Sequence, residues 1–333
     1  MTRRQIIRAF DLFCGGGGSS LGAKQAGATP VGGVDLWPVA TDAYALNLAG
    51  TKTYTTDLNS LDPSHVASDV GSIDLLLASP ECTHHSVAKG NKPRSEESKQ
   101  LAYQVIRFAR EMRPRWVVVE NVIQMRSWEC FPDWLRQLKE IGYHSIVLTL
   151  EAERFGVPQT RRRLFVICDR DRAPRVPRPY RRKDATVKQA IKRAIRGTWS
   201  YAFTPLNNGH RAEKTIQRAE RAIAAVGTNE EFIMVYYGSD GAGGFQTLDR
   251  PLRTITTLDR FALVRPNCVG HEMRMLQPAE LAVAMGFPRN YRFPKSATRR
   301  DCVKLVGNAV CPPVMRAVVR ALLKSGRSFS REA

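Results

Sequence analysis

Cys82 is the residue in this sequence with the most obvious chemical potential. It follows the apolar run 73–77 and Pro80, so its thiol should lie just beyond the carboxyl end of a buried strand, where open α/β folds place their sites. A thiolate at such a position is a candidate nucleophile. Taken alone, Cys82 also fits a small buried hydrophobe, the commoner role of a cysteine in an intracellular chain.

Two further segments carry charged residues at the ends of expected strands. The apolar run 117–119 is followed by Glu120 and Asn121, and three arginines at 161–163 precede the apolar run 164–167. Glu120 could act as an acid or base beside the thiol, or it could form an ion pair with one of the many arginines. These segments indicate one polar site at the edge of a sheet.

A glycine-rich loop near the N-terminus predicts a ligand site. The apolar run 9–12 leads into glycines 15–18, and a helix is expected over 21–26. The backbone of such a loop can approach a ligand closely, and the N-terminus of the helix favours an anionic group. Asp35 follows the expected strand 31–34, at the position where these folds use an acid to bind ribose hydroxyls.

Together the segments resemble the cytosine-5 DNA methyltransferases. The matching patterns are DLFxGxGG at 11–18, the Cys82 loop, ENV at 120–122, QxRxR at 159–163 and GN(A/S)V at 307–310. Five motifs in this order are very unlikely to agree by chance. The resemblance covers the chain apart from a stretch ahead of Pro266. It implies a doubly wound, Rossmann-like, mostly parallel α/β sheet, a small inserted target-recognition domain, and methylation of cytosine carbon 5 in DNA.

The resemblance also assigns the catalytic roles. Cys82 would add to carbon 6 of a cytosine flipped out of the duplex, which activates carbon 5. Glu120 would contact ring nitrogen 3, and Arg163 would stabilise charge at the carbonyl oxygen. Arg161 is implied in the same pocket wall, and Gln159 would hold the loop.

The Cys82 loop departs from the family pattern. The usual Pro-Cys-Gln is Glu81-Cys82-Thr83 here, followed by His84-His85. A carboxylate beside the thiol raises its pKa unless it points away or pairs with a cation. The departure keeps open a catalytically impaired DNA-binding homologue as an alternative.

S-adenosyl-L-methionine is the cofactor that the resemblance implies. Asp35 would bind its ribose, Asp57 its adenine amino group, and Phe13 would lie against the adenine ring. The aromatic residue that commonly follows the ribose acid is Leu36 here, with Trp37 one place later; both acids could instead be solvated loop carboxylates. The expected cofactor-binding residues are Phe13, Gly15, Gly17, Asp35, Leu36, Asp57, Leu58, Asn308 and Val310.

Composition points to nucleic acid as the partner. The net charge is +20, and the segment 154–200 holds fifteen Lys or Arg against three Asp, a pattern that suits phosphate contacts. Base-reading candidates lie in 247–257, and the loop after Cys82 is either a DNA-closing lid or a solvated loop. The expected DNA-binding residues are Ser86, Lys89, Arg94, Arg250, Arg253 and Thr256.

Three segments are expected along the chain. Alternating strand and helix signals run to about Asp169, including a helix over 96–112 that Pro114 ends. We therefore expect a catalytic domain at 1–170, a target-recognition domain at 171–264 with a helix over 185–196 and a strand over 232–237, and a C-terminal segment, 265–333, that returns to the catalytic domain.

Cysteine spacing and hydropathy limit the cellular setting that we expect for the protein. Seven cysteines with no CxxC pair predict neither a disulfide framework nor a metal site. No apolar run approaches the roughly 20 residues of a membrane span, so we expect a cytoplasmic, nucleoid-associated monomer, with a cognate restriction endonuclease as a second partner. A transfer-RNA cytosine-5 methyltransferase is the nearest alternative, and a nicotinamide dehydrogenase would need neither Cys82 nor the basic insert.

Overall fold

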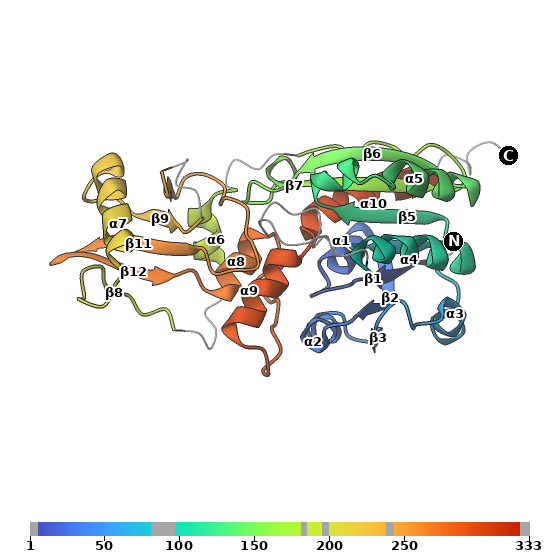
Figure 1. Ribbon diagram of the computed structural model, residues 1–333, viewed down its shortest axis with the longest axis horizontal. Helices are drawn as coiled ribbons and strands as arrows, with labels where there is room; N and C mark the ends of the chain where they lie inside the picture. The colour runs from blue at the N-terminus through green and yellow to red at the C-terminus, as the bar shows by residue number, and fades with distance from the viewer. Residues whose placement is uncertain (1–5, 81–96, 181–184, 195–199, 238–242, 327–333) are drawn as a thin grey trace, which may run out of the picture.

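The computed structural model describes residues 6–80, 97–180, 185–194, 200–237 and 243–326. They form a larger and a smaller lobe, each built on one sheet, and the first and last described elements, β1 and α10, both belong to the larger lobe (Figure 1).

The larger lobe contains a seven-stranded sheet in the order β3-β2-β1-β4-β5-β7-β6. Pairing is parallel from β3 to β5, and β7 runs antiparallel to both of its neighbours. The expectation of a mostly parallel, doubly wound sheet is confirmed. The strands are β1 (Ile7–Leu12), β2 (Ala28–Asp35), β3 (Lys52–Thr55), β4 (Leu75–Ala78), β5 (Trp116–Asn121), β6 (His144–Glu151) and β7 (Arg162–Asp169).

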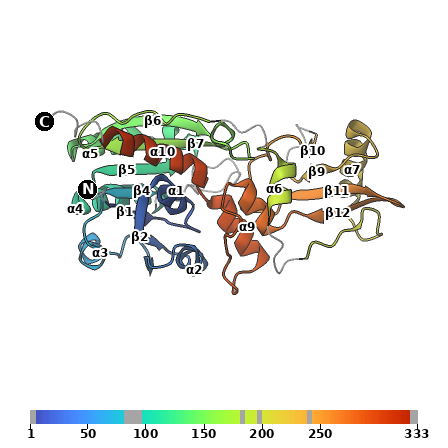
Figure 2. The same ribbon diagram turned by 180° about the vertical axis from the view of Figure 1, so that it is seen from behind.

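Helices cover both faces of this sheet because its central strands are apolar on both sides. Leu75 and Leu77 pack in one core layer, whereas Leu76 and Ala78 pack in the other. One layer includes α1 (Gly18–Ala26) and α10 (Pro312–Gly326), which lie against each other, and Figure 2 shows α10 from behind. The other layer includes α3 (Pro63–Val70), α4 (Glu97–Met112) and α5 (Phe131–Glu140), while α2 (Pro38–Asn47) covers β2 and β3.

The predicted crossover helix is α4, and its end follows the sequence signals. It stops at Met112, and Arg113 then adopts a left-handed conformation with φ 47° before Pro114, which cannot continue a helix. Strand β5 begins at Trp116. Two short 3-10 turns, η2 (Ile123–Ser127) and η3 (Ala152–Phe155), follow β5 and β6.

The smaller lobe is a five-stranded antiparallel sheet in the order β10-β9-β11-β12-β8. The predicted helix and strand appear as α6 and β9. The expected domain end at residue 264 falls inside β11, and the sheet continues to Met275 through β12. Its elements are α6 (Val187–Arg193), β8 (Thr204–Pro205), α7 (Glu213–Val226), β9 (Phe232–Val235), β10 (Phe245–Thr247), β11 (Phe261–Asn267) and β12 (Gly270–Met275).

The chain then returns to the larger lobe through α8 (Pro278–Ala284), α9 (Arg299–Asn308) and α10. Capping boxes start α8 at Gln277 and α9 at Thr298, which satisfies N–H groups that a helix start leaves unpaired. By length and composition the stretch Arg299–Lys324 could cross a membrane, but it is mostly buried in the fold. Its apolar character is that of a core segment.

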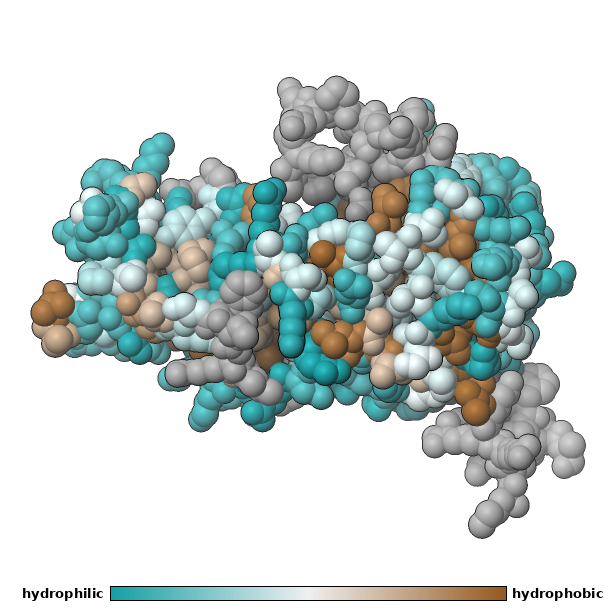
Figure 3. Space-filling view, turned by 90° about the horizontal axis from the view of Figure 1, so that it is seen from below, coloured by the Kyte–Doolittle hydropathy of each residue, from teal (hydrophilic) through white to brown (hydrophobic). Residues whose placement is uncertain are grey.

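Short backbone pairing also joins the lobes. Thr160 N donates to Leu252 O at 2.8 Å, and Leu252 N donates to Pro158 O at 2.9 Å. On the face seen in Figure 3, hydrophobic residues form small scattered groups among hydrophilic ones. Most of the large apolar side chains are buried in the cores instead. The backbone pairing between Thr160 and Leu252 ties the two lobes together next to the QxRxR segment.

Candidate active site

The carboxyl edge of the large sheet brings the expected catalytic segments together. Strand β4 ends at Ala78 and β5 at Asn121, and Asn121 Nδ2 donates to Pro80 O at 3.3 Å. This contact ties the segment that leads into Cys82 to the end of the strand that carries Glu120. Cys82 itself, its neighbours 81 and 83–85, and the DNA-binding candidates Ser86, Lys89 and Arg94 lie outside the described residues.

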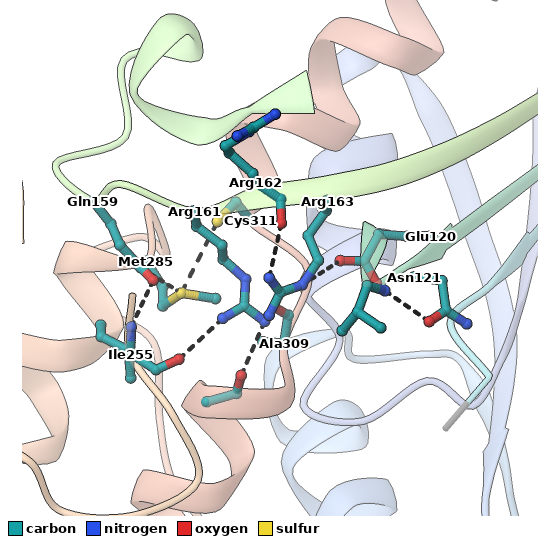
Figure 4. Close-up of polar contacts among 12 residues, drawn as sticks. Glu120, Asn121, Gln159, Arg161, Arg162, Arg163, Ile255, Met285, Ala309 and Cys311 are labelled. Carbon is teal, nitrogen blue, oxygen red and sulfur yellow. Dashed lines mark hydrogen bonds and ion pairs between the residues drawn. The ribbon is translucent and has the colours of Figure 1, made fainter. Parts of the chain in front are cut away.

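Glu120 and Arg163 face each other at this edge (Figure 4). The Nε atom of Arg163 lies 3.4 Å from Glu120 Oε1, and Glu120 is 6% exposed. Burial raises the pKa of the Glu120 carboxyl, and the positive charges of Arg163 and Arg161 offset only part of that rise. A carboxyl group in this setting can hold a proton more readily than a surface glutamate.

Arg161 is turned into the junction of the two lobes. Its guanidinium donates to Ile255 O at 3.0 Å, Gly307 O at 3.0 Å and Ala309 O at 3.2 Å. Burial, together with the charge of Arg163, lowers its pKa to about 10, so it remains charged at neutral pH. Arg161 lines the expected pocket and also fixes the backbone around it.

Gln159 supports the same junction. Its Oε1 accepts from Ile255 N at 2.9 Å, and its Nε2 lies 2.7 Å from Met285 Sδ. The expected role of holding the loop matches this geometry, although Met285 was not anticipated from the sequence.

A small pocket lies beside the three charged groups Glu120, Arg161 and Arg163. Its remaining walls are apolar and include a second thiol, that of Cys311, which is 4% exposed. Sequence reasoning missed this residue because Cys311 lies just outside the GN(A/S)V segment, between Val310 and Pro312, with no polar neighbour to mark it. The apolar walls are Leu150, Ala152, Phe165, Val310, Cys311 and Val314.

Asp35 closes the other part of the site, beneath the glycine loop. Its Oδ2 accepts from Gly15 N and its Oδ1 from Trp37 N, both at 2.9 Å. Burial raises its pKa, while these backbone bonds and Lys304 act in the opposite direction. Gly15 has φ 49°, and a side chain there would meet no atom within 4 Å, so open space lies beside the acid and the loop.

The remaining cofactor candidates differ in position. Phe13 is partly buried with φ 56°, and Leu58 is buried in the core at 3% exposure. Leu36 is 69% exposed. Asp57 Oδ1 accepts from the backbone and side chain of Asn59 at 2.9 and 3.1 Å.

Trp37, one place after Leu36, packs against the return segment. Its ring lies under Lys304 Nζ at 4.2 Å and packs beside Leu305, so it joins the fold of α9. Asn308, at the end of this helix, is exposed, and the carbonyl of Val310 lies beside Gly18. The GN(A/S)V segment therefore reaches the glycine loop.

The DNA-binding candidates in the smaller lobe lie on the segment that leads into β11. Arg250 is exposed, and its carbonyl accepts from Val187 N. Arg253 Nη2 donates to Phe245 O at 2.9 Å. The Thr256 backbone touches Gly307, where a Cβ would lie 2.2 Å from Thr256 O. Arg250 is thus the side chain presented to solvent, and Thr256 lies at the lobe junction.

No cluster of three metal-binding side chains occurs among the residues that the structure describes. Glu120, Arg161 and Arg163 bring one acid and two guanidiniums together at this part of the sheet edge, near Pro80. They can protonate and polarise a ring held against a nucleophile.

Comparisons with known proteins agree with this arrangement. The type II methyltransferase M.DdeI of Desulfomicrobium norvegicum is 32% identical over 169 residues, 48% of this chain and 40% of that protein. The type II methyltransferase M.HindV of Haemophilus influenzae is 26% identical over 324 residues, 95% of this chain and 96% of that protein.

A solved structure, that of the Entamoeba histolytica methyltransferase EhMeth, shares the fold. It has a TM-score of 0.71 at 14% identity and covers 97% of this chain and 100% of that one. The family model for C-5 cytosine-specific DNA methylases matches residues 7–324. Because that match takes in both lobes and every motif at the site, the chain belongs to the C-5 cytosine-specific DNA methylase family.

Proposed function

We propose that the protein transfers a methyl group from S-adenosyl-L-methionine to carbon 5 of a flipped cytosine in a specific duplex DNA sequence, with Cys82 as the nucleophile. The observation that carries this proposal is the buried Glu120–Arg163 pair at the end of β5, joined through Asn121 to Pro80, two positions before Cys82.

The chain's own groups account for activation of the ring. The Cys82 thiolate forms a bond to carbon 6, and the electron pair displaced from the ring is taken up as Glu120 gives a proton to nitrogen 3. Arg163 donates to the carbonyl oxygen, where negative charge gathers. After carbon 5 has accepted the methyl group, a base removes its proton, and that electron pair forms the carbon 5–carbon 6 double bond as the carbon 6–sulfur bond breaks. The thiolate is restored, and nitrogen 3 returns its proton to Glu120.

The raised pKa of Glu120 suits this role, because burial favours the protonated carboxyl group that would donate at nitrogen 3. Arg161 acts one step further away. By bonding Ile255 O and Gly307 O it holds the wall against which the ring would lie, so we assign it as a positioning residue.

The residues at the glycine loop fit the cofactor. An ionised carboxylate has about four acceptor positions, and Asp35 does not use all of them on its backbone partners Gly15, Trp37 and Leu36, so it can also accept from a ribose hydroxyl. The first turn of α1 has backbone N–H groups without intrahelical partners, which favour the methionine carboxylate. The cofactor, when bound, supplies an electrophilic methyl group. Phe13, Leu36, Asp57, Leu58, Asn308 and Val310 complete the proposed surround.

Duplex DNA is the proposed substrate, acted on in the cytoplasm by a monomer working beside a restriction endonuclease. The net charge of +20 supports phosphate binding. Ser86, Lys89 and Arg94 are proposed for the DNA near Cys82. Arg250, Arg253 and Thr256 are proposed for the flanking bases.

Methylation of mixed-sequence duplex DNA followed by base-resolved sequencing tests the proposal. Carbon 5 methylation at one recurring sequence, lost in Cys82→Ala, is the expected result. Methyl transfer to transfer RNA alone would assign a different substrate, and cofactor-independent DNA binding without methylation would leave only a binding protein.

A further inference from the structure

Gly16 is a glycine for a reason that the family pattern does not supply. In DLFxGxGG the position of Gly16 is open to other residues. Gly15 and Gly17 have φ values of 49° and 84°, which favour glycine, but Gly16 has no positive φ. Its backbone would therefore accept a side chain.

Space, and not backbone conformation, excludes a side chain at Gly16. A Cβ there would lie 2.3 Å from the hydroxyl oxygen of Tyr291, while the next nearest atoms, Tyr291 Cζ and Leu305 Cδ2, would each lie at 3.6 Å. The last two distances are ordinary contacts. A single oxygen atom thus accounts for the clash.

That oxygen is held in place by a hydrogen bond to the loop. Tyr291 Oη donates to Gly16 O at 2.8 Å. The ring packs between Phe287, with centroids 4.4 Å apart, and Phe293, with centroids 5.3 Å apart. Burial raises the pKa of this hydroxyl, so it remains a donor.

The peptide that follows Gly16 is fixed on both sides. Its carbonyl accepts from Tyr291, and its N–H, on Gly17, donates to Cys14 O at 2.9 Å. The segment that carries Tyr291 is itself anchored, because Asn47 Nδ2 donates to Arg292 O at 2.7 Å and Arg292 N donates to Asn47 Oδ1 at 2.9 Å. The return segment between α8 and α9 therefore braces the loop that opens α1.

We propose that Tyr291 is a positioning residue for the cofactor loop, and that Gly16 and Tyr291 are a matched pair in which the hydroxyl occupies the space of the missing side chain. The inference rests on the proposed role of the glycine loop in binding S-adenosyl-L-methionine. It adds a residue about 275 positions away in the chain to that site.

Calorimetric binding of S-adenosyl-L-methionine to four variants of the full chain tests the pair. Tyr291→Phe keeps the ring and leaves the Gly16 carbonyl unpaired, so the dissociation constant should rise about five- to tenfold. Gly16→Ala should weaken binding more, through the clash. The double variant should bind as tightly as Tyr291→Phe alone, because only contacts at 3.6 Å remain.

Tyr143→Phe is the matched control. Its hydroxyl also donates to a backbone carbonyl, Pro114 O at 2.5 Å, but it lies in the layer of α4 and α5. It should lower the melting temperature without changing cofactor affinity. The melting temperature without cofactor measures the clash independently of binding. It should be lowered in Gly16→Ala and restored in the double variant.

Unchanged affinity in Tyr291→Phe, or a double variant no better than Gly16→Ala in both binding and melting, would overturn the inference. A wild-type chain that binds no S-adenosyl-L-methionine but shows the melting rescue would keep the pair and reject the proposed cofactor. The two failures are therefore distinguishable.

Discussion

Carboxyl groups buried in the larger lobe and carboxyl groups at the surface of the smaller lobe lie in opposite environments. In the larger lobe Asp11, Asp35 and Glu120 have raised pKa values, with burial as the main cause in each. In the smaller lobe the pKa of Asp249 is lowered by the Thr247 hydroxyl and that of Glu272 by Arg265. These two acids lie at the surface.

The contrast separates chemistry from recognition. A desolvated carboxyl group can hold or accept a proton in direct contact with a ligand. An exposed acid that pairs with a neighbouring arginine or hydroxyl instead fixes the orientation of that side chain, and the surface around it keeps its excess of positive charge. This contrast fits the proposed division of labour, with chemistry in the larger lobe and DNA recognition in the smaller one.

Replacing Glu120, the acid at the proposed active site of the larger lobe, should give the largest effect. Glu120→Gln keeps the size and the hydrogen-bonding shape but cannot deliver the proton, so turnover should fall by about two orders of magnitude or more. Single-turnover methylation measures it. Glu151→Gln, at the end of β6, is the control; near-normal turnover with a lowered melting temperature in Glu120→Gln would instead show a purely structural ion pair.

Breaking the junction between the lobes should come next. Arg161→Met removes the donors to Ile255, Gly307 and Ala309 and leaves buried carbonyls unpaired, so the free energy of unfolding should fall by about 2 to 3 kcal/mol. Denaturant titration measures it against Arg162→Met, because Arg162 is the next residue in the chain and its side chain is exposed at the start of β7. Equal stability of the two variants would contradict the junction role.

The pH dependence of stability should differ in sign between Asp11, which is buried in the larger lobe, and Asp249, which is exposed in the smaller one. Burial raises the folded pKa of Asp11 from 3.8 to about 7, so its stabilising effect is complete below 3.8 and is lost as pH rises toward 7. Asp11→Asn should remove that loss. Asp249, with a lowered folded pKa, should lose its stabilising effect as pH falls.

Unfolding free energies of wild type, Asp11→Asn and Asp249→Asn measure both slopes, that of Asp11 between pH 3.8 and about 7 and that of Asp249 below pH 3.8. Parallel pH profiles for the two variants would remove the contrast between buried and exposed acids.

The smallest effects are expected for the arginines of the smaller lobe. Arg250→Ala should cost about 1 to 3 kcal/mol on the preferred DNA sequence and less on scrambled duplex, as a base contact does. Arg253→Ala should also lower the melting temperature, because Arg253 Nη2 bonds Phe245 O. Affinity for the preferred and the scrambled duplex, measured at two salt concentrations, gives the specificity of each variant. If both variants discriminate between the duplexes as well as the wild type does, the segment 247–257 does not read bases.

Sequence was sufficient where function depends on the ends of neighbouring strands. Glu120 and Asp35 lie at the ends of the apolar runs that become β5 and β2, and parallel pairing brings these strand ends to one edge. Arg163, at the start of β7, reaches the same edge because β7 runs antiparallel to β5, a direction that the apolar runs did not indicate. The expected ends of the crossover helix were right to within one residue at Glu97 and at Met112.

Sequence was insufficient where a site depends on segments far apart in the chain. No local pattern indicates that Arg161 bonds Gly307, or that Tyr291 meets Gly16. The end of the inserted domain was also misplaced at 264, because β11 and β12 form one hairpin whose strand signals run on to Met275. Turn and packing geometry decide such boundaries, and a single sequence leaves them open.

Covalent trapping on a duplex that carries 5-fluorocytosine at the target position tests the central claim most directly, because the carbon 5 substituent cannot leave as a proton and the adduct accumulates. With S-adenosyl-L-methionine present, peptide mapping should place the DNA on Cys82, and Cys82→Ala should form no adduct. An adduct that persists in Cys82→Ala, or that maps to Cys311 in the neighbouring pocket, would contradict the account.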